Sequence, residues 1–347
     1  MTETECRNKF MAAAERQGWK DAQGVVCALS GGGDSVALLW LMKKYFKGRI
    51  VAAHLDHCTR AGESHKDALF AAELCRKWDV EISIKTADVE KCRLKGESFE
   101  MAGRRLRYLH FEETAGKLCL PFIALGHNAD DVVETQLLNL TRGCGISGMR
   151  GIPERRGNIV RPVIDFTRGE LREILLRENI AWCDDFTNDE NNYKRNKIRN
   201  ILIPWIKENL NENFESVMLG LSAQVRAEMA EREKKIAEIL SEISYSEPPA
   251  IAAWKTNGLK KISETLLAGA VRMQGAALSL PALSRERTET LCSLIRRGGC
   301  WRFQWASDVE VCYSERGIGW LHRADVIAAK ERKKNNSKII LPWWAKL

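Results

Sequence analysis

The sequence predicts an α/β protein whose first part is a mostly parallel sheet with helices on both faces. A mainly helical region and a small antiparallel β unit are expected to follow it. Short apolar runs alternate with amphipathic stretches over residues 1–141, and a glycine-rich turn joins the first run to its helix. Toward the C-terminus, over 301–321, polar residues alternate with aromatic and β-branched ones. Alternation of apolar runs with amphipathic stretches is typical of a parallel sheet covered by helices, and residue-by-residue alternation is typical of antiparallel strands.

The expected elements follow in order along the chain. Strands are expected from Val25 and over 49–56, 80–87 and 121–126. Helices are expected over 1–20, after the glycine turn, and over 64–78, 98–116, 129–141, 167–179, 192–210 and 213–245, with further helical segments to 295. The glycine- and arginine-rich stretch 142–157 is interpreted as a mobile loop, and the run 330–338 as an exposed basic stretch. We expect three domains: a catalytic domain at 1–212, a helical domain at 213–295 and the β unit with a basic tail at 296–347.

Composition limits the class of protein. The chain has 347 residues, 45% of them apolar and 29% charged, which is ordinary for a soluble globular protein of two or three domains. It contains no apolar run long enough for a membrane helix, and its first residues lack a signal-peptide pattern. The 11 cysteines include no Cys-x-x-Cys pair, which argues against a disulfide framework or a zinc ribbon. We therefore expect a cytoplasmic protein.

Positive charge is concentrated toward the C-terminus. The net charge is +8, and residues 213–347 hold 21 Lys and Arg against 15 Asp and Glu. Such an excess indicates a polyanionic partner, although a solvated surface explains a modest excess nearly as well.

The glycine turn, Ser30-Gly-Gly-Gly-Asp-Ser35, is the first candidate site. Successive glycines allow the backbone to fold closely around a ligand, and the N–H groups at the start of the next helix favour an anion there. The alternative is a turn in which Ser30, Asp34 or Ser35 only caps the helix. The turn lacks the Gly-Lys-Ser/Thr of a Walker A loop, and Val36 occupies the third-glycine place of the Rossmann fingerprint. An aspartate beside phosphates is explained if Mg²⁺ lies between Asp34 and the phosphate oxygens.

Two further polar segments follow strands. His54, Asp56 and Cys58 end the second expected strand and should lie beside the glycine turn. They could contact nucleotide or be ordinary strand-end residues; a metal site there lacks further ligands at suitable spacing. His127, Asp131 and Glu134 are spaced i, i+4, i+7 and would share one helix face. Acids in a first turn can simply complement the helix dipole, but this set favours a role with Mg²⁺ and nucleotide.

Two pairs of arginines are spaced one helical turn apart. Arg104 and Arg107 form the first pair, and Arg195 and Arg199 form the second. Each pair could be a solvated basic face. Arginine is also the side chain best suited to bidentate recognition of phosphate or carboxylate.

Together these motifs resemble a known family. The glycine turn is similar to the pyrophosphate (PP) loop of ATP pyrophosphatases, which have a Rossmann-like fold. The first 210 or so residues resemble the tRNA(Ile)-lysidine synthases. The pieces that carry this resemblance occur in the family's order: Ser30–Ser35, His54–His57 with Arg60, Arg104–Tyr108, His127–Thr135, Arg142–Gly148, Asp185–Asn188 and Tyr193–Arg199. Gly103 stands where the family commonly has alanine, and residues after 213 match only loosely.

The resemblance implies a ligase that uses ATP and Mg²⁺ to join L-lysine to the wobble cytidine of the tRNA(Ile) whose anticodon is CAU. It also implies a possible homodimer. The implied catalytic residues are Asp34, His127, Asp131 and Glu134, with Asp34, Asp131 and Glu134 as candidate Mg²⁺ ligands. Asp131 or Glu134 could instead orient the lysine ammonium or accept its proton. The implied ATP-binding residues are Ser30, Gly31, Gly32, Gly33, Asp34, Ser35, His54 and Asp56. The implied tRNA or substrate contacts are Arg104, Arg107, Arg142, Arg195, Asn196 and Arg199.

Three rival functions remain at the level of sequence. A tRNA-thiolating enzyme shares the loop, but such enzymes typically use a cysteine pair that this chain lacks. An amide-forming ligase of the same superfamily would act on a small molecule without tRNA. A nucleotide-binding module without catalysis would need neither the acids nor the arginines.

Overall fold

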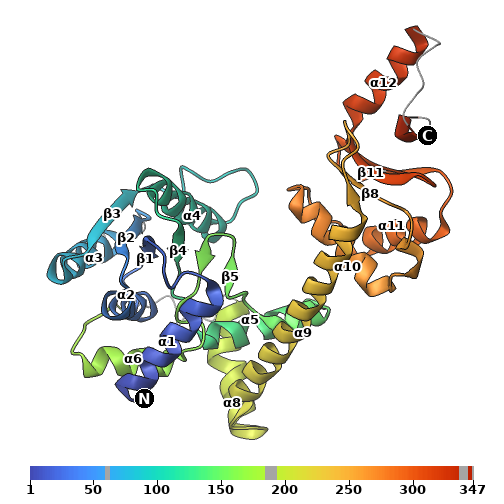
Figure 1. Ribbon diagram of the computed structural model, residues 1–347. Helices are drawn as coiled ribbons and strands as arrows, with labels where there is room; N and C mark the ends of the chain where they lie inside the picture. The colour runs from blue at the N-terminus through green and yellow to red at the C-terminus, as the bar shows by residue number, and fades with distance from the viewer. Residues whose placement is uncertain (59–62, 184–193, 336–342, 346–347) are drawn as a thin grey trace. The chain divides into compact units, whose positions relative to one another are not determined.

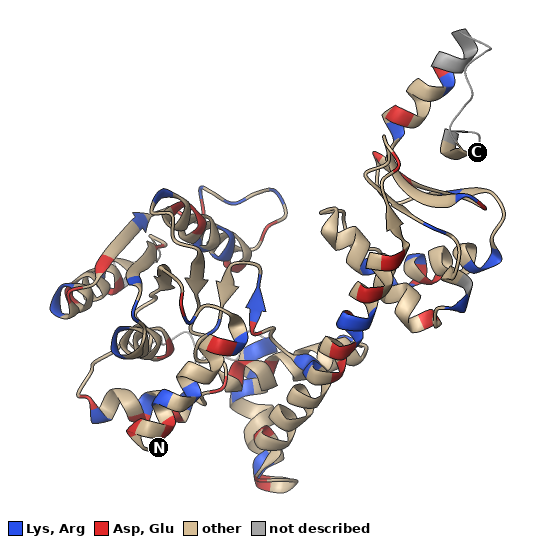
Figure 2. Cartoon of the chain, viewed as in Figure 1, with Lys and Arg blue, Asp and Glu red and all other residues tan. Residues whose placement is uncertain are grey.

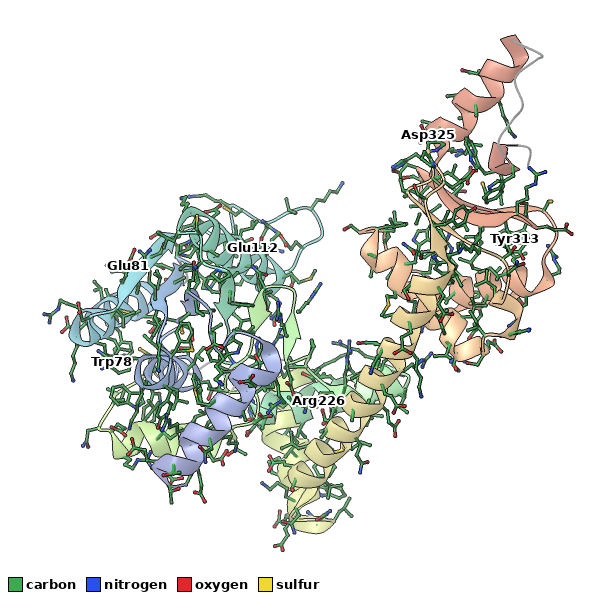
Figure 3. The ribbon with its side chains drawn as sticks, in the orientation of Figure 1. Trp78, Glu81, Glu112, Arg226, Tyr313 and Asp325 are labelled. Carbon is green, nitrogen blue, oxygen red and sulfur yellow. The ribbon has the colours of Figure 1, made fainter. Side chains whose placement is uncertain are left out.

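The computed structural model describes residues 1–58, 63–183, 194–335 and 343–345. The chain forms two compact units, Met1–Val225 and Arg226–Leu347. The boundary falls inside one long helix, where Arg226 is labelled in Figure 3. The three-part division expected at 212 and 295 concerns roles as well as compactness, and it stays a prediction.

The first unit contains a six-stranded sheet in the order β3-β2-β1-β4-β6-β5 (Figure 1). All neighbours are parallel except β5 and β6. The strands are β1 (Gly24–Ala28), β2 (Arg49–Asp56), β3 (Glu81–Thr86), β4 (Phe122–Ala124), β5 (Arg155–Arg156) and β6 (Ile159–Val160). The chain progresses from β1 toward β3 on one side and from β4 toward β6 on the other. The order therefore reverses between β1 and β4, and open parallel sheets bind ligands at the carboxyl ends of the strands beside such a reversal.

The α-helices of the first unit occupy the expected places, whereas the short helix η1 lies in the stretch that was expected to be a loop. The helices of this unit are α1 (Glu3–Gln17), α2 (Gly33–Tyr45), α3 (Glu63–Trp78), α4 (Phe99–Lys117), α5 (Ala129–Thr141), η1 (Ile146–Arg150), α6 (Arg168–Arg177), α7 (Lys194–Lys197), η3 (Ile198–Leu202) and α8 (Ile203–Asn209), with α9 (Phe214–Ile243) crossing into the second unit. Several begin with a side-chain cap, such as the capping box of Thr167 and Glu170 at α6. The expected helix over 192–210 contains a π-helical turn, η3.

Alternate residues of the strands face two cores, as the period of two in a strand requires. Val25 and Cys27 pack against α1, α2, α3 and α6, whereas Val26 packs against α4 through Phe111 and Ala115. Helices therefore cover both faces of the sheet, which confirms the predicted architecture. A smaller core joins α5 to η3, α8 and the start of α9.

The second unit is built on an antiparallel sheet in the order β7-β8-β11-β10-β9. Its elements are β7 (Ser244–Tyr245), β8 (Ala252–Trp254), η4 (Leu259–Lys261), α10 (Glu264–Ala277), α11 (Arg285–Arg297), β9 (Trp301–Gln304), β10 (Val309–Ser314), β11 (Gly317–His322), α12 (Arg323–Asn335) and η5 (Trp343–Ala345). Helices α10 and α11 pack on the tryptophan-rich face of the sheet. Along α9, charged residues of both signs follow one another (Figure 2), which is typical of a solvated helix face.

Three details differ from the sequence expectations. The supposed loop at 142–157 contains η1 and β5, because its backbone pairs with β6 and caps the end of α5. The region before 295 contains the strands β7 and β8, which were expected to be helical or irregular. They are too short for a periodic signal and form by pairing with β11. The start of the basic stretch at 330–338 is helical up to residue 335, within α12. Within the described residues, no helix is long and apolar enough to span a membrane.

Candidate active site

The glycine turn lies at the carboxyl end of β1 and opens α2. The hydroxyl of Ser35 donates to the carbonyl of Gly32 over 2.8 Å and accepts the N–H of Ser30 over 3.1 Å. The hydroxyl of Ser30 also donates to Ser35, and it accepts the N–H of Gly32 over 3.4 Å. The two serines thus brace the loop from inside. The first N–H groups of α2 have no partner within the helix, so they can bind an anion.

A neighbouring segment packs on the loop. The N–H of Cys183 donates to the carbonyl of Gly31 over 3.0 Å, and Gly31 has a φ of 95°, which favours glycine. A Cβ at Gly33 would lie 3.5 Å from the ring of Trp182. These contacts fix the backbone path that the glycines make possible.

The turn after β4 approaches the loop closely because it contains Gly126. A Cβ at this position would lie 3.2 Å from the backbone of Asp34, closer than ordinary packing allows. Asn128 then caps α5 by accepting the N–H of Asp131, and Asp131 accepts the N–H of Asn128 in return. The prediction that His127 shares a helix face with Asp131 and Glu134 is therefore wrong. His127 precedes the N-cap of α5, so it lies in the turn before the helix and not on the helix face.

Four acids and three arginines form one cluster beside the loop, which we call the acid–arginine cluster. It consists of Asp34, Asp130, Asp131, Glu134, Arg168, Arg195 and Arg199. Glu134 is its centre, because its side chain is 1% exposed and contacts all three guanidinium groups. Arg195 Nε and Arg199 Nε each lie 2.6 Å from a carboxylate oxygen of Glu134. Arg195 also donates to Asp131 over 2.8 Å.

Arg168 connects this cluster to the loop. Its Nε lies 3.7 Å from Asp34 Oδ2, and its Nη2 lies 3.4 Å from Glu134 Oε1. Its backbone N–H donates to Asp130 over 2.8 Å. The sequence reasoning missed Arg168; the signal that could have found it is its position as the first residue of a capped helix, directly after Thr167.

The carboxylates and guanidinium groups of the acid–arginine cluster shift one another's charge equilibria. Burial alone would raise the pKa of Glu134, but the hydrogen bond from Arg199 and the charges of Arg195 and Arg199 hold it below its usual range. Burial raises the pKa of Asp34; Arg168 opposes this, and Asp131 and Asp130 add to it. Among the described residues, four carboxylates face three guanidinium groups, so this part of the cluster has one more negative than positive group when ionised.

A pocket of about 430 Å³ opens on this cluster. Its charged lining includes Asp130, Glu134, Arg168, Arg199, Lys207, Glu208 and Glu215, and its apolar lining is Ile203 and Pro204. The volume suits a small-molecule ligand, and the lining offers groups of both charges beside an apolar wall.

The remaining predicted residues lie in several places. His54 is buried and its Nδ1 lies 2.8 Å from the carbonyl of Leu29, just before the loop, and Asp56 accepts the N–H of Cys58. Arg142 caps the end of α5 and is exposed, and Asn196 is half-buried in α7. Arg104 and Arg107 lie on α4 rather than in the acid–arginine cluster. Arg60 and the motif at 185–188 lie outside the described residues.

The fold and the loop define a nucleotide-binding α/β protein of the pyrophosphate-loop type. A family model described as PP-loop domain matches residues 2–206. The chain belongs to this PP-loop family. Sequence relatives agree: it is 39% identical over 225 residues to the tRNA(Ile)-lysidine synthase of Clostridioides difficile, covering 63% of this chain and 49% of that protein. It is 41% identical over 197 residues to the enzyme of the same name in Porphyromonas gingivalis, covering 56% and 43%.

The chain spans about half the length of these curated relatives. Among solved structures, a U34-tRNA thiolase from Methanococcus maripaludis is similar with a TM-score of 0.52, covering 64% of this chain and 78% of that one. Because the two chains are only 16% identical, this similarity shows the fold alone. It confirms the parallel-sheet architecture and does not favour thiolation.

Proposed function

We propose that this chain is an ATP-dependent ligase that joins lysine to the C2 position of the wobble cytidine in the CAU-anticodon tRNA(Ile), forming lysidine. The PP-loop and the similarity to named lysidine synthases support this reading. The structural observation that carries it is the acid–arginine cluster beside the loop. Among its described residues the cluster has one more carboxylate than guanidinium group, which favours binding of a further cation. The lysine ammonium is such a cation, and the guanidinium groups can pair with the lysine carboxylate.

The proposed reaction has two steps. The C2 oxygen of the cytidine attacks the α-phosphorus of ATP, and pyrophosphate leaves. The lysine amine then forms a bond to C2, loses a proton, and AMP leaves with the former C2 oxygen. The N–H groups of the loop, at Gly33 and Asp34, would hold the leaving pyrophosphate.

The residues fit a Mg²⁺ ion at Asp34, which would offset negative charge on the phosphates. This carboxylate lies at the mouth of the loop, and the neighbouring acids contribute to raising its pKa, so a cation there is favourable. No group of three or more His, Cys, Asp or Glu side chains suited to a metal occurs within the described part of the chain. Asp34 with phosphate oxygens is proposed in place of a site built from Asp131 and Glu134, because Arg195 and Arg199 already pair with those two acids.

Asp131 and Glu134 are better suited to holding the amine. Glu134 remains ionised because its pKa is lowered, so it is a weak proton acceptor and a strong partner for ammonium. Since both of its oxygens already contact arginines, the amine must displace one of these contacts. Arg195 is the least enclosed of the three arginines, with a side chain 37% exposed. We propose that Arg195 moves to the RNA when lysine binds.

Contacts to the RNA or to another substrate are assigned to Arg104, Arg107 and Arg142, with Arg195, Asn196 and Arg199 near the reacting base. The second unit and its basic residues would contribute further backbone contacts. The reacting cytidine must leave its stack to reach the loop.

The proposal is tested by measuring AMP release with ATP, Mg²⁺, lysine and a CAU tRNA(Ile) transcript. We expect release to require both lysine and RNA, and to fall to background when either is omitted. AMP release that needs ammonia and a small acid but no RNA would instead identify an amide-forming ligase.

A further inference from the structure

A second set of arginines lies at the same edge of the sheet but has no carboxylate partners. It consists of Arg104 and Arg107 on α4 and Arg161 directly after β6, and we call it the arginine cluster. None of the three forms an ion pair with another described residue. They range from exposed at Arg104 to 4% exposed at Arg161. A buried guanidinium without a counter-charge is unfavourable unless a ligand supplies one.

Arg161 is held rigidly although part of its donor set is unused. Gln17, at the end of α1, donates to the carbonyl of Arg161 over 2.9 Å and accepts its backbone N–H over 2.8 Å. The Nη1 of Arg161 donates to the carbonyl of Pro153 over 2.7 Å. Its Nε is buried and has no partner. The Arg161 side chain is therefore held in place before a ligand binds, and its Nε can still donate. Preorganisation of this kind lowers the entropic cost of binding.

Two further buried nitrogen atoms near Arg161 also lack a hydrogen-bond partner. The Nε of Arg107 and the Nδ1 of His127 are also buried without partners. Most buried polar groups in folded proteins have a partner, so three such atoms in one region point to a missing ligand. Arg104 lies over the ring of Tyr108 at 5.0 Å and donates to its hydroxyl over 3.0 Å, which fixes the exposed end of the cluster.

The charges of the three arginines act on His127. Burial, followed by the charges of Arg161, Arg195, Arg104 and Arg107, lowers the pKa of His127 to about 3. A neutral imidazole can donate to a phosphate oxygen or accept from a guanidinium without adding to the repulsion. The histidine predicted as a catalytic partner of the acids is thus a member of the positively charged region.

We propose that Arg104, Arg107 and Arg161 bind one phosphate group of a substrate. The ligand class is a phosphate ester, because three guanidinium groups without carboxylates match a dianionic or diester phosphate. Its source is either the RNA backbone beside the reacting nucleotide or the bound ATP. The identity of the RNA rests on the proposed function; the phosphate site itself does not.

The test compares three variants of the full chain. Arg161→Gln removes the buried guanidinium, and Arg104→Ala removes the exposed one and keeps the test valid if the first variant folds poorly. Arg172→Ala, an exposed arginine on α6, is the matched control. Binding of a labelled CAU anticodon stem-loop, of a hairpin with a scrambled loop and of ATP is measured at two salt concentrations.

If the phosphate belongs to RNA, Arg161→Gln and Arg104→Ala weaken binding of both hairpins about 10-fold and reduce the salt slope by about one, with ATP affinity unchanged. If it belongs to the nucleotide, the affinity for ATP falls instead. Unchanged affinity for both ligands in folded variants would overturn the proposal. Wild-type chain that binds RNA but incorporates no lysine would refute the proposed function and leave this site intact.

Discussion

The acid–arginine cluster and the arginine cluster lie at the same edge of one sheet, but only the first contains carboxylates that pair with its arginines. In the first, Glu134 compensates Arg168, Arg195 and Arg199 inside the protein. In the second, Arg104, Arg107 and Arg161 have no such acid among the described residues. A buried charge that is paired within the chain supports the fold, whereas one left unpaired awaits a ligand. The difference assigns the cationic substrate to the first cluster and the phosphate to the second.

The largest effect is expected for Asp34. Asp34→Ala removes the carboxylate at the mouth of the loop and should reduce AMP formation by at least about 10³-fold, since charge stabilisation in the transition state is lost. The thermal unfolding midpoint should stay near that of wild type, because Asp34 is partly exposed, with its side chain 30% accessible. Glu73→Ala, which removes an exposed acid on α3, is the control. Near-normal turnover in Asp34→Ala would remove this residue from the mechanism.

The two clusters should also differ in how much their charged side chains stabilise the fold. Glu134→Gln leaves three guanidinium groups without their shared carboxylate and should lower the free energy of unfolding by about 2 kcal/mol, below the 3–5 typical of breaking a fully buried pair because the arginines reach solvent. Arg161→Gln breaks no ion pair and should change that free energy by less than about 1 kcal/mol. Urea denaturation measures both. Equal losses in the two variants would show that the clusters do not differ in the way described.

Acidity should weaken the fold through the buried histidines. Burial, followed by nearby arginines, lowers the pKa of His127 to about 3, and burial with Arg107 lowers that of His57 to about 4. The unfolded chain takes up these protons below its ordinary pKa near 6.5, whereas the folded chain does not. The stabilisation is therefore complete above pH 6.5 and is lost as the pH falls toward 4, by up to about 1.4 kcal/mol per pH unit for each histidine.

Between pH 6.5 and 5 the carboxylates with lowered pKa stay ionised in the folded chain and largely so in the unfolded chain. A comparison with His127→Asn removes the contribution of Asp34, whose pKa is raised. Thermal melts across this pH range should show a declining midpoint in wild type and a shallower decline in His127→Asn. An identical decline in that variant would mean that His127 is not held neutral in the folded chain.

A smaller effect than that of Glu134→Gln is expected at Gly126. Gly126→Ala places a Cβ 3.2 Å from the backbone of Asp34, so the loop and the turn after β4 must separate by a few tenths of an ångström. We expect the free energy of unfolding to fall by about 1 kcal/mol. The free energy of ATP binding should fall by a larger fraction of its wild-type value. Isothermal titration with ATP measures the second effect. Gly103→Ala is the control, because its Cβ would lie at an ordinary 3.5 Å from His57.

Much of the first unit could be predicted from the sequence because its signals are local. The glycine turn, the capped helices and the apolar strands each depend on neighbouring residues, so β1 to β4 and α1 to α6 were found within a few positions. The acids at 131 and 134 were also identified as a set.

What the sequence could not provide depends on contacts between distant residues. The pairing of Glu134 with Arg195 and Arg199 spans more than 60 positions, and the capping box around Arg168 marks a helix start without indicating a site. His127 was misplaced because its helical spacing to Asp131 ignores the cap at Asn128; the helix begins at Ala129, so His127 lies outside it. Arg161 has no sequence signal beyond following a strand of two residues, whose existence depends on pairing with β4 and β5.

The most direct test of the account is incorporation of labelled lysine into purified tRNA. The chain is incubated with ATP, Mg²⁺ and either the CAU tRNA(Ile) or tRNA(Met), which has the same anticodon. We predict one lysine per tRNA(Ile), none in tRNA(Met), and an equal amount of AMP. Folded chain that binds ATP and releases AMP without placing lysine in tRNA(Ile) would contradict the account.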